Sequence, residues 1–127
     1  MLDTDTVSFA LRGRGQVATR LLGHRPSELC MSSITLGELR YGAEKRRSRR
    51  LHRLIDTFVE SVTVAPFDES AADRFGAVAA LLARRGTAIG GFDALIGAHA
   101  LALGLILVTH NLKHFVRIPG LRAESWI

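Results

Sequence analysis

Four polar residues of this chain combine the chemistry and the placement of a catalytic site: Asp3, Glu38, Asp93 and Asn111. Each follows an expected strand or opens an expected helix. Three of them carry carboxylates, which repel one another at close range unless a proton or a cation joins them. Mg²⁺, or Mn²⁺ in its place, suits such an all-oxygen site. A metal held there can activate water to hydrolyse a phosphodiester.

Each of these residues also has a purely structural interpretation. Asp3 fits the N-cap of a helix, and Glu38 completes the pattern Thr35-x-x-Glu38, a capping box. Asp93 lies in the first turn of its helix, where the helix dipole favours a carboxylate, and Asn111 is a good cap. Taken singly, these interpretations are favoured. The metal-site hypothesis therefore depends on the four residues occurring together.

The elements that must position these side chains alternate between short apolar runs and amphipathic stretches. Strands are expected as a stub at Leu2 and at 29–32, 62–67, 105–108 and 122–126, and helices at 7–23, 35–43, 51–58, 69–84 and 92–103, with a helical turn from residue 111. This alternation predicts a three-layer α/β/α fold with a central, mainly parallel sheet of four to five strands. Because parallel strands end at one edge of a sheet, the acidic residues converge if the strands before Asp3, Ser33 and Thr109 are neighbours.

Length and composition limit the class of protein. A chain of 127 residues with 47% hydrophobic residues fits one globular domain spanning 1–127. Without a long uninterrupted apolar stretch or a signal-peptide pattern, no membrane span or secretion is expected. The single Cys30 cannot form an internal disulfide, which suits a reducing cytoplasm. We therefore predict a cytoplasmic protein.

The net charge of +5, from 17 basic and 12 acidic residues, favours a polyanionic partner such as nucleic acid. The excess gathers in a basic cluster, which comprises Lys45, Arg46, Arg47, Arg49, Arg50 and Arg53. Two interpretations stay open: a solvated turn between helices, or contact with RNA or an acidic partner. For the second we select Lys45, Arg46, Arg47, Arg49 and Arg50.

The histidines give a weaker signal. His99 lies on an apolar helical stripe and is expected to be a hydrogen-bonded core or interface residue. His110 and His114 flank Asn111 at a spacing of four, which could suit a transition metal. The sequence places no further Cys or His to complete that site.

The ordered motifs resemble a known family. The matching segments are MLDTD at 1–5, SSITLGELRYG at 32–42, IGGFDALI at 89–96 and GLILVTHN at 104–111, followed by 119–121 and 124–126. Together they resemble the PIN-domain ribonucleases and, within these, the VapC-type toxins of bacterial toxin–antitoxin pairs. The resemblance covers the whole chain in order.

The resemblance implies Mg²⁺-dependent cleavage of RNA. It makes Asp3 and Asp93 the main metal ligands and Glu38 the third carboxylate. Asn111 stands where many PIN domains have a fourth Asp, and Thr4 and Thr109 would be hydroxyls near the metal or the phosphate. It also implies a homodimer, neutralised by a VapB-type antitoxin that places a cationic side chain in the acidic site and supplies DNA binding in a hetero-oligomer.

The chain departs from the family pattern in three places. Asp5 often corresponds to Asn, and the toxins often carry Glu where this chain has His114. Only Met1 and Leu2 precede Asp3, so either the first strand is short or the natural chain begins earlier. Asp5 therefore either strengthens metal binding or points into the start of the helix.

Three alternatives remain at this point. Asp3 and Asp5 fit the DxDxT pattern of haloacid-dehalogenase-type phosphatases, although the strand that should precede them is nearly absent. A receiver-type signalling domain would need Asp68 and Lys113 as its functional pair and leaves Glu38 unused. A PIN-like protein that binds RNA or a partner without cutting is the third alternative.

Overall fold

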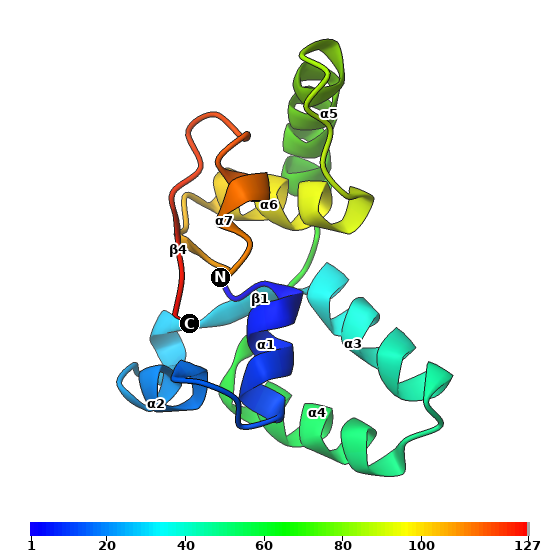
Figure 1. The fold of residues 1–127 in the computed structure, drawn as a ribbon, viewed down its shortest axis with the longest axis vertical. Helices are drawn as coiled ribbons and strands as arrows, with labels where there is room; N and C mark the ends of the chain where they lie inside the picture. The colour runs from blue at the N-terminus through cyan, green and yellow to red at the C-terminus, as the bar shows by residue number, and fades with distance from the viewer. Residues whose placement is uncertain (127) are drawn as a thin grey trace.

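The computed structural model describes residues 1–126, and short strands alternate with helices along the chain (Figure 1). In chain order the elements are α1 (Thr4–Leu11), α2 (Val17–Leu22), a 3₁₀ turn (Pro26–Glu28), β1 (Cys30–Ser32), α3 (Ser33–Lys45), α4 (Arg49–Ser61), β2 (Thr63–Ala65), α5 (Glu69–Arg84), α6 (Gly91–Leu103), β3 (Leu107–Val108), α7 (Leu112–Phe115) and β4 (Ala123–Glu124). Among the described helices, none is both long and apolar enough to cross a lipid bilayer.

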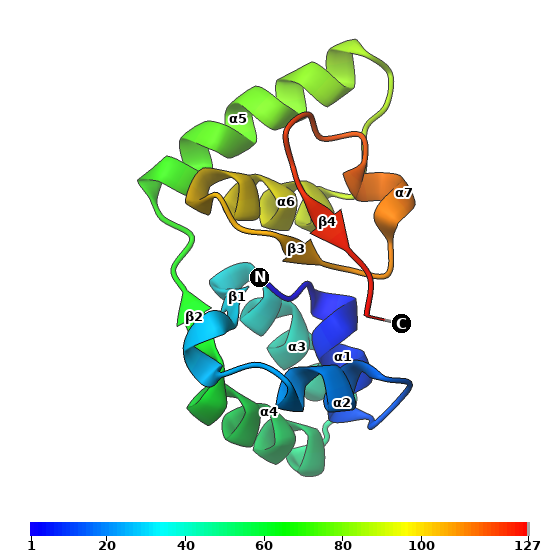
Figure 2. The same cartoon turned by 90° about the vertical axis from the view of Figure 1, so that its left-hand side faces the viewer.

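The strands form parallel pairs that meet at a single residue. β1 pairs with β2 and β3 pairs with β4, and Leu2 bridges in parallel to both Met31 of β1 and Val108 of β3. The resulting order is β2–β1–Leu2–β3–β4. Figure 2 shows this sheet between a group formed by α1 to α4 and a group formed by α5 to α7. The predicted three-layer fold with a parallel sheet is confirmed.

Backbone hydrogen bonds hold the first residues from both sides. The Leu2 amide donates to the carbonyl of Cys30 at 2.8 Å, and the Asp3 amide donates to the carbonyl of Val108 at 3.0 Å. The Val108 amide donates to the carbonyl of Met1 at 2.8 Å. Leu2 is fully buried. Two residues therefore suffice as a central strand, because their neighbours rather than their own length fix their position.

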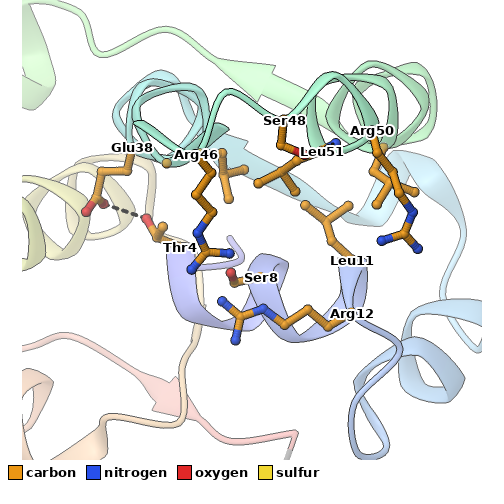
Figure 3. Close-up of a pocket in the computed structure, with 12 residues that line it drawn as sticks. Thr4, Ser8, Leu11, Arg12, Glu38, Arg46, Ser48, Arg50 and Leu51 are labelled. Atoms are coloured by element: carbon orange, nitrogen blue, oxygen red, sulfur yellow. Dashed lines mark hydrogen bonds between the residues drawn. The ribbon is translucent and has the colours of Figure 1, made fainter. Parts of the chain in front are cut away.

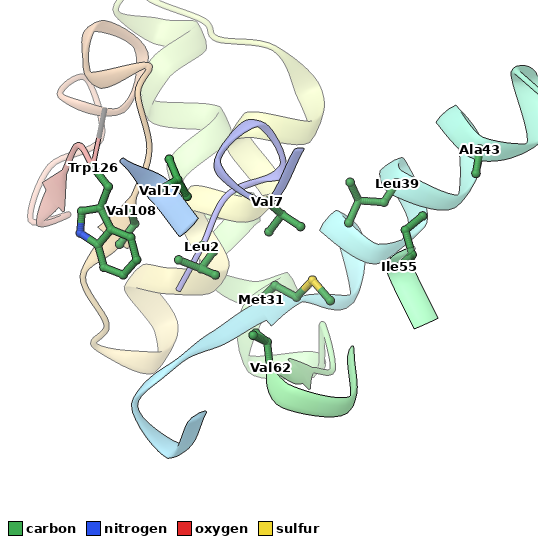
Figure 4. Close-up of a cluster of buried hydrophobic side chains, with 10 residues drawn as sticks. All are labelled: Leu2, Val7, Val17, Met31, Leu39, Ala43, Ile55, Val62, Val108 and Trp126. Carbon is green, nitrogen blue, oxygen red and sulfur yellow. The ribbon is translucent and has the colours of Figure 1, made fainter. Parts of the chain in front are cut away.

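Two apolar cores lie on the two faces of the sheet. The first comprises Leu2, Val7, Val17, Met31, Leu39, Ala43, Ile55, Val62, Val108 and Trp126 (Figure 4). The second comprises Met1, Val78, Leu82, Ile96, Ala98, Ala100, Leu107, Phe115 and Ile118. Successive strand residues face opposite sides, so β3 contributes Val108 to one core and Leu107 to the other. This double burial is the pattern expected of a central parallel strand.

Several predicted boundaries are wrong. The run 105–108 forms a strand only over its last two residues, and β2 and β4 are likewise shorter than predicted. α1 begins at Thr4 rather than near Val7, directly after Asp3. α3 begins at Ser33 with Ser32 as its N-cap, whose hydroxyl accepts from the Ile34 amide at 3.1 Å. The predicted capping box of Thr35 and Glu38 is therefore wrong.

Candidate active site

Asp3 lies at the carboxyl edge of the sheet, at the point where the central bridge becomes α1. Its Oδ1 accepts a hydrogen bond from the Thr6 amide at 2.8 Å, so the predicted N-cap is confirmed. Unlike an ordinary surface cap, its side chain is buried, with 3% exposure. Burial raises the pKa of Asp3, while hydrogen bonds from Thr109 and Thr6 oppose the rise. A buried carboxylate with this pKa is stabilised as an anion when a cation lies beside it.

Thr109 connects two of the predicted site residues. Its hydroxyl donates to Asp3 and accepts from the backbone amide of Asn111 at 2.9 Å. Thr109 is itself fully buried at the end of β3. The chain after β3 is therefore fixed relative to the chain after Leu2.

Glu38 reaches the same edge from α3 and is held by Thr4. The Thr4 hydroxyl donates to Oε1 of Glu38 at 2.6 Å (Figure 3). It also lies 3.2 Å from the Thr35 hydroxyl, from which it can accept. Burial is the main cause that raises the pKa of Glu38, and the charges of Asp93, Asp5 and Asp3 raise it further. The Thr4 hydrogen bond opposes that rise. Glu38 therefore shares one electrostatic environment with the other carboxylates.

Asp93 belongs to the first turn of α6 and contacts His114 of α7. His114 Nδ1 lies 3.3 Å from Asp93 Oδ2 and 2.9 Å from the side-chain amide of Asn111. Nδ1 carries at most one proton, and a carboxylate can only accept. The Asn111 atom at 2.9 Å is Nδ2, which donates to Nδ1 when that nitrogen is unprotonated; when Nδ1–H donates to Asp93 instead, the Asn111 amide must turn its oxygen to the ring. The Asn111 side chain thus turns to His114 instead of capping α7, which corrects its predicted role as a cap.

Asp5 is exposed and does not take part in the contacts among Asp93, His114 and Asn111. Its Oδ2 lies 4.0 Å from His110 Nε2, and its side chain is 58% exposed. His110 in turn packs edge-on against Phe9. His110 and His114 therefore face different carboxylates, and among residues 1–126 they do not form the two-histidine metal site considered from their spacing.

The carboxylates share one region without forming a closed metal cage. Within the described chain, no group of three or more His, Cys, Asp or Glu side chains is arranged to hold an ion. The available donors are carboxylate, hydroxyl and amide oxygens of Asp3, Glu38, Asp93 and Asn111. Magnesium commonly takes only one or two carboxylates and retains several waters, whereas structural zinc requires four close ligands. The donor set therefore fits a hard divalent cation that is partly hydrated.

The predicted basic cluster divides into two groups. Arg46 and Arg50 line a cavity of about 380 Å³ that also contains Glu38 and Thr4 (Figure 3). Lys45, Arg47 and Arg49 are exposed outside that lining, as is Arg53. The interpretation as a turn between helices is correct for the backbone, since the cluster spans the end of α3 and the start of α4.

Sequence reasoning missed Arg12 and Ser8 at this cavity. Arg12 follows α1 and lines the same cavity as Arg46. The signal was present in the spacing, because Thr4, Ser8 and Arg12 recur every four residues and share one face of a helix. That face becomes meaningful only when α3 and α4 lie opposite it.

His99 has the structural role predicted for it. It is 1% exposed, and its Nδ1 lies 2.8 Å from the Ser32 hydroxyl. Burial lowers the pKa of His99, so the neutral ring accepts from that hydroxyl. Cys30 is a half-buried free thiol packed beside the second core.

The chain matches the PIN domain over residues 1–121. It is 41% identical over 127 residues to a tRNA(fMet)-specific endonuclease VapC of Salmonella typhimurium, covering 99% of this chain and 96% of that protein. It is 38% identical over 128 residues to a Ribonuclease VapC2 of Haemophilus influenzae, covering 100% and 97%.

Solved structures give the same result for the fold. DNA-bound VapBC from Salmonella typhimurium matches with a TM-score of 0.90 and 41% identity, covering 100% of this chain and 97% of the matched chain. VapBC2 from Rickettsia felis, bound to a DNA fragment of its promoter, matches with a TM-score of 0.90 and 31% identity, covering 100% and 98%. The chain belongs to the PIN-domain family, within its VapC group.

Proposed function

We propose that this protein is a metal-dependent endoribonuclease and the toxin of a VapBC-type pair. The observation that carries the proposal is the position of Leu2 between β1 and β3. This position brings Asp3 to the edge of the sheet where Thr109 and Glu38 also lie. Thr109 is hydrogen-bonded to Asp3, and Glu38 is hydrogen-bonded to Thr4. PIN-domain nucleases generally depend on a divalent metal ion. A carboxylate-rich edge beside uncompensated arginines is suited to a metal and a polyanion together.

Within this proposal, Asp3, Asp93 and Glu38 hold Mg²⁺, for which Mn²⁺ can substitute. When bound, the ion would acidify a water for attack and would offset the charge on the reacting phosphate. Thr4 orients the Glu38 carboxylate by its hydrogen bond. Asp3 is held in one orientation by the Thr6 amide and the Thr109 hydroxyl, so its remaining lone pairs stay available.

Asn111 cannot act as a base because its amide is neutral. Its proposed role is to orient water or substrate together with His114, which lies 2.9 Å away. Asp5 contributes charge to the region rather than a directed contact, because its side chain is largely exposed.

The substrate and partners follow from the relatives. Since the Salmonella relative is named a tRNA(fMet)-specific endonuclease, initiator tRNA is the proposed substrate to test first. The matched structures are VapBC complexes, two of them with DNA, so we propose a VapB-type antitoxin as partner. A homodimer within a toxin–antitoxin hetero-oligomer, acting in the cytoplasm as one domain, completes the proposal.

The test is cleavage of an initiator tRNA transcript by the purified chain, freed of antitoxin, in Mg²⁺ or Mn²⁺. Asp3→Ala and Asp93→Ala should each lower the cleavage rate by about 100-fold or more. Asp73→Ala is the matched control, because Asp73 is an exposed carboxylate on α5. Cleavage that survives a chelator, or either site substitution, contradicts the proposal.

A second candidate function is binding of RNA without cleavage. It is favoured by the pair Asn111 and His114, which stand beside Asp93 where a carboxylate would add charge for the metal. That candidate predicts that the native chain binds the transcript in Mg²⁺ and leaves it intact. An Asp93-dependent cleavage product excludes it.

A further inference from the structure

The cavity beside Glu38 has an acidic end and a basic end. α1 forms one wall, and the end of α3 with the start of α4 forms the other. Figure 3 shows Glu38 and Thr4 at one end, and the guanidinium groups of Arg12 and Arg46 approaching from opposite walls, with the Ser8 side chain between them in this view. The positive charges of Arg12 and Arg46 therefore face one cavity, although 34 positions separate the two residues in the chain.

The converging arginines have no internal counter-ion. Carboxylates of α3 and α4 are engaged elsewhere: Asp56 pairs with Arg40 at 2.5 Å, Glu44 contacts His52 at 3.3 Å, and Glu38 accepts from Thr4 at 2.6 Å. Within residues 1–126, Arg12 and Arg46 form no ion pair. Two like charges that face one cavity repel each other, and an anion placed between them is attracted to both and offsets that repulsion.

We propose that Arg12 and Arg46, with the Ser8 hydroxyl, bind the phosphate that neighbours the cleaved linkage of RNA. This proposal rests on the proposed ribonuclease function. Guanidinium groups match phosphate oxygens with paired hydrogen bonds, and a hydroxyl adds one more donor. RNA is favoured over an acidic protein segment because the cavity runs from Glu38, one of the proposed metal ligands, to the arginines. RNA carries a phosphate at every nucleotide, so one phosphate can contact the arginines while the next lies near Glu38.

The site would set the direction in which RNA crosses the carboxylates. One phosphate occupies the arginine end, so the reacting phosphate is displaced towards Glu38 and Asp3. The two arginines then bind and position the substrate and take no part in the chemical step. Their loss should raise KM more than it lowers kcat, whereas loss of Asp93 should lower kcat.

The first experiment measures binding of a fluorescein-labelled initiator tRNA transcript in a chelator, over a range of salt concentrations. Arg12→Ala and Arg46→Ala should each weaken binding by about tenfold. Each should also reduce the slope of log affinity against log salt by about 0.7 if the contacted segment is single-stranded. Arg46→Lys should retain the slope. Arg85→Ala, at the exposed end of α5, is the matched control and should bind as the native chain does.

The second experiment places a single uncharged methylphosphonate linkage at successive positions around the cut site. The native chain should lose cleavage efficiency at one linkage next to the cut, and the Arg12→Ala, Arg46→Ala double variant should be insensitive at that same linkage. Since both arginines are exposed, these variants should keep the native melting temperature and circular dichroism.

The outcomes separate this proposal from the proposed function. Unchanged RNA affinity in both alanine variants overturns the phosphate site, and so does weakened binding of the antitoxin with unchanged RNA affinity. Arginine-dependent RNA binding by a native chain that never cuts supports the phosphate site and contradicts the nuclease.

Discussion

His114 Nδ1 lies 3.3 Å from Oδ2 of Asp93, so the imidazole lies against the proposed metal-binding carboxylate. A second neighbour, the Asn111 amide at 2.9 Å, fixes the same nitrogen. A ring in this position can orient Asp93, but it adds no negative charge for a cation. Metal affinity should therefore respond to the residue at position 114.

The first prediction concerns that charge. His114→Glu should increase the affinity for Mg²⁺ several-fold, because cation sites strengthen with the number of charged oxygen ligands. Isothermal titration with Mg²⁺ measures the change. Lys113→Glu, an exposed position on the same helix, controls for a general increase in negative charge. Equal gains in both variants would show that position 114 has no special relation to the ion.

The second prediction concerns the hydrogen bond of 2.6 Å from Thr4 to Glu38. Thr4→Val removes the donor and should lower kcat about tenfold, as expected for loss of a group that orients a metal ligand. That bond lowers the pKa of Glu38 against the effect of burial, so the variant's pKa should rise further. The acidic limb of the pH–rate profile should therefore move to higher pH.

Thr4→Ser should restore both the rate and the profile, because it keeps the hydroxyl. Thr19→Val, at an exposed position on α2, provides the matched control for exchanging Thr for Val. A Thr4→Val variant with a lower rate and an unmoved acidic limb would assign Thr4 a packing role instead.

The third prediction concerns stability without metal. Burial raises the pKa of Asp3 above that of the unfolded chain, so the folded protein loses stability as pH rises through that pKa. Asp3→Asn keeps an N-cap acceptor and removes the charge. Its melting temperature in a chelator should exceed that of the native chain at neutral pH by a few degrees, and the difference should vanish in acid, below the unfolded pKa.

Addition of Mg²⁺ should reverse this order. A cation that binds only the folded state stabilises it by mass action, so the native chain should gain melting temperature and Asp3→Asn should gain little. If the substitution destabilises the metal-free protein at neutral pH, the hydrogen bonds to Asp3 outweigh the effect of its burial.

The sequence predicted the fold and the convergence of the acidic residues, because both depend on alternation and on the common edge of parallel strands. The boundary of α3 shows where local patterns fail. Ser32 and Thr35 are both plausible caps, but the hydroxyl of Ser32 also bonds to His99, which is 67 positions away. Such a contact is decided by packing across the sheet and has no trace in nearby residues.

The site shows the same division. Asp3, Glu38 and Asp93 were predicted from their positions relative to expected strands and helices, and their metal-binding roles remain predictions. The contacts of His114 and the alignment of Arg12 with Arg46 depend on how separate helices meet. The strand at Leu2 could be predicted only in part. A single residue carries no periodicity, and Leu2 becomes part of the sheet only through backbone hydrogen bonds to β1 and β3.

The last prediction tests the packing that places α7, and with it His114. A Cβ added at Gly97 of α6 would lie 2.5 Å from Cδ1 of Ile118 and 3.3 Å from the Phe115 ring, both fully or almost fully buried. Gly97→Ala should therefore lower the free energy of unfolding by about 1–3 kcal/mol, as overpacking does. Gly76→Ala on α5 is the matched control, because its Cβ would meet open space.

Urea unfolding measures both variants. Gly76→Ala should stabilise the protein by about 0.5–1 kcal/mol, because alanine loses less backbone entropy than glycine in a helix. Since Phe115 directly follows His114, Gly97→Ala should also weaken Mg²⁺ binding, whereas Gly76→Ala should leave it unchanged. If Gly97→Ala matches Gly76→Ala in stability, the packing of α6 against α7 is looser than these distances require.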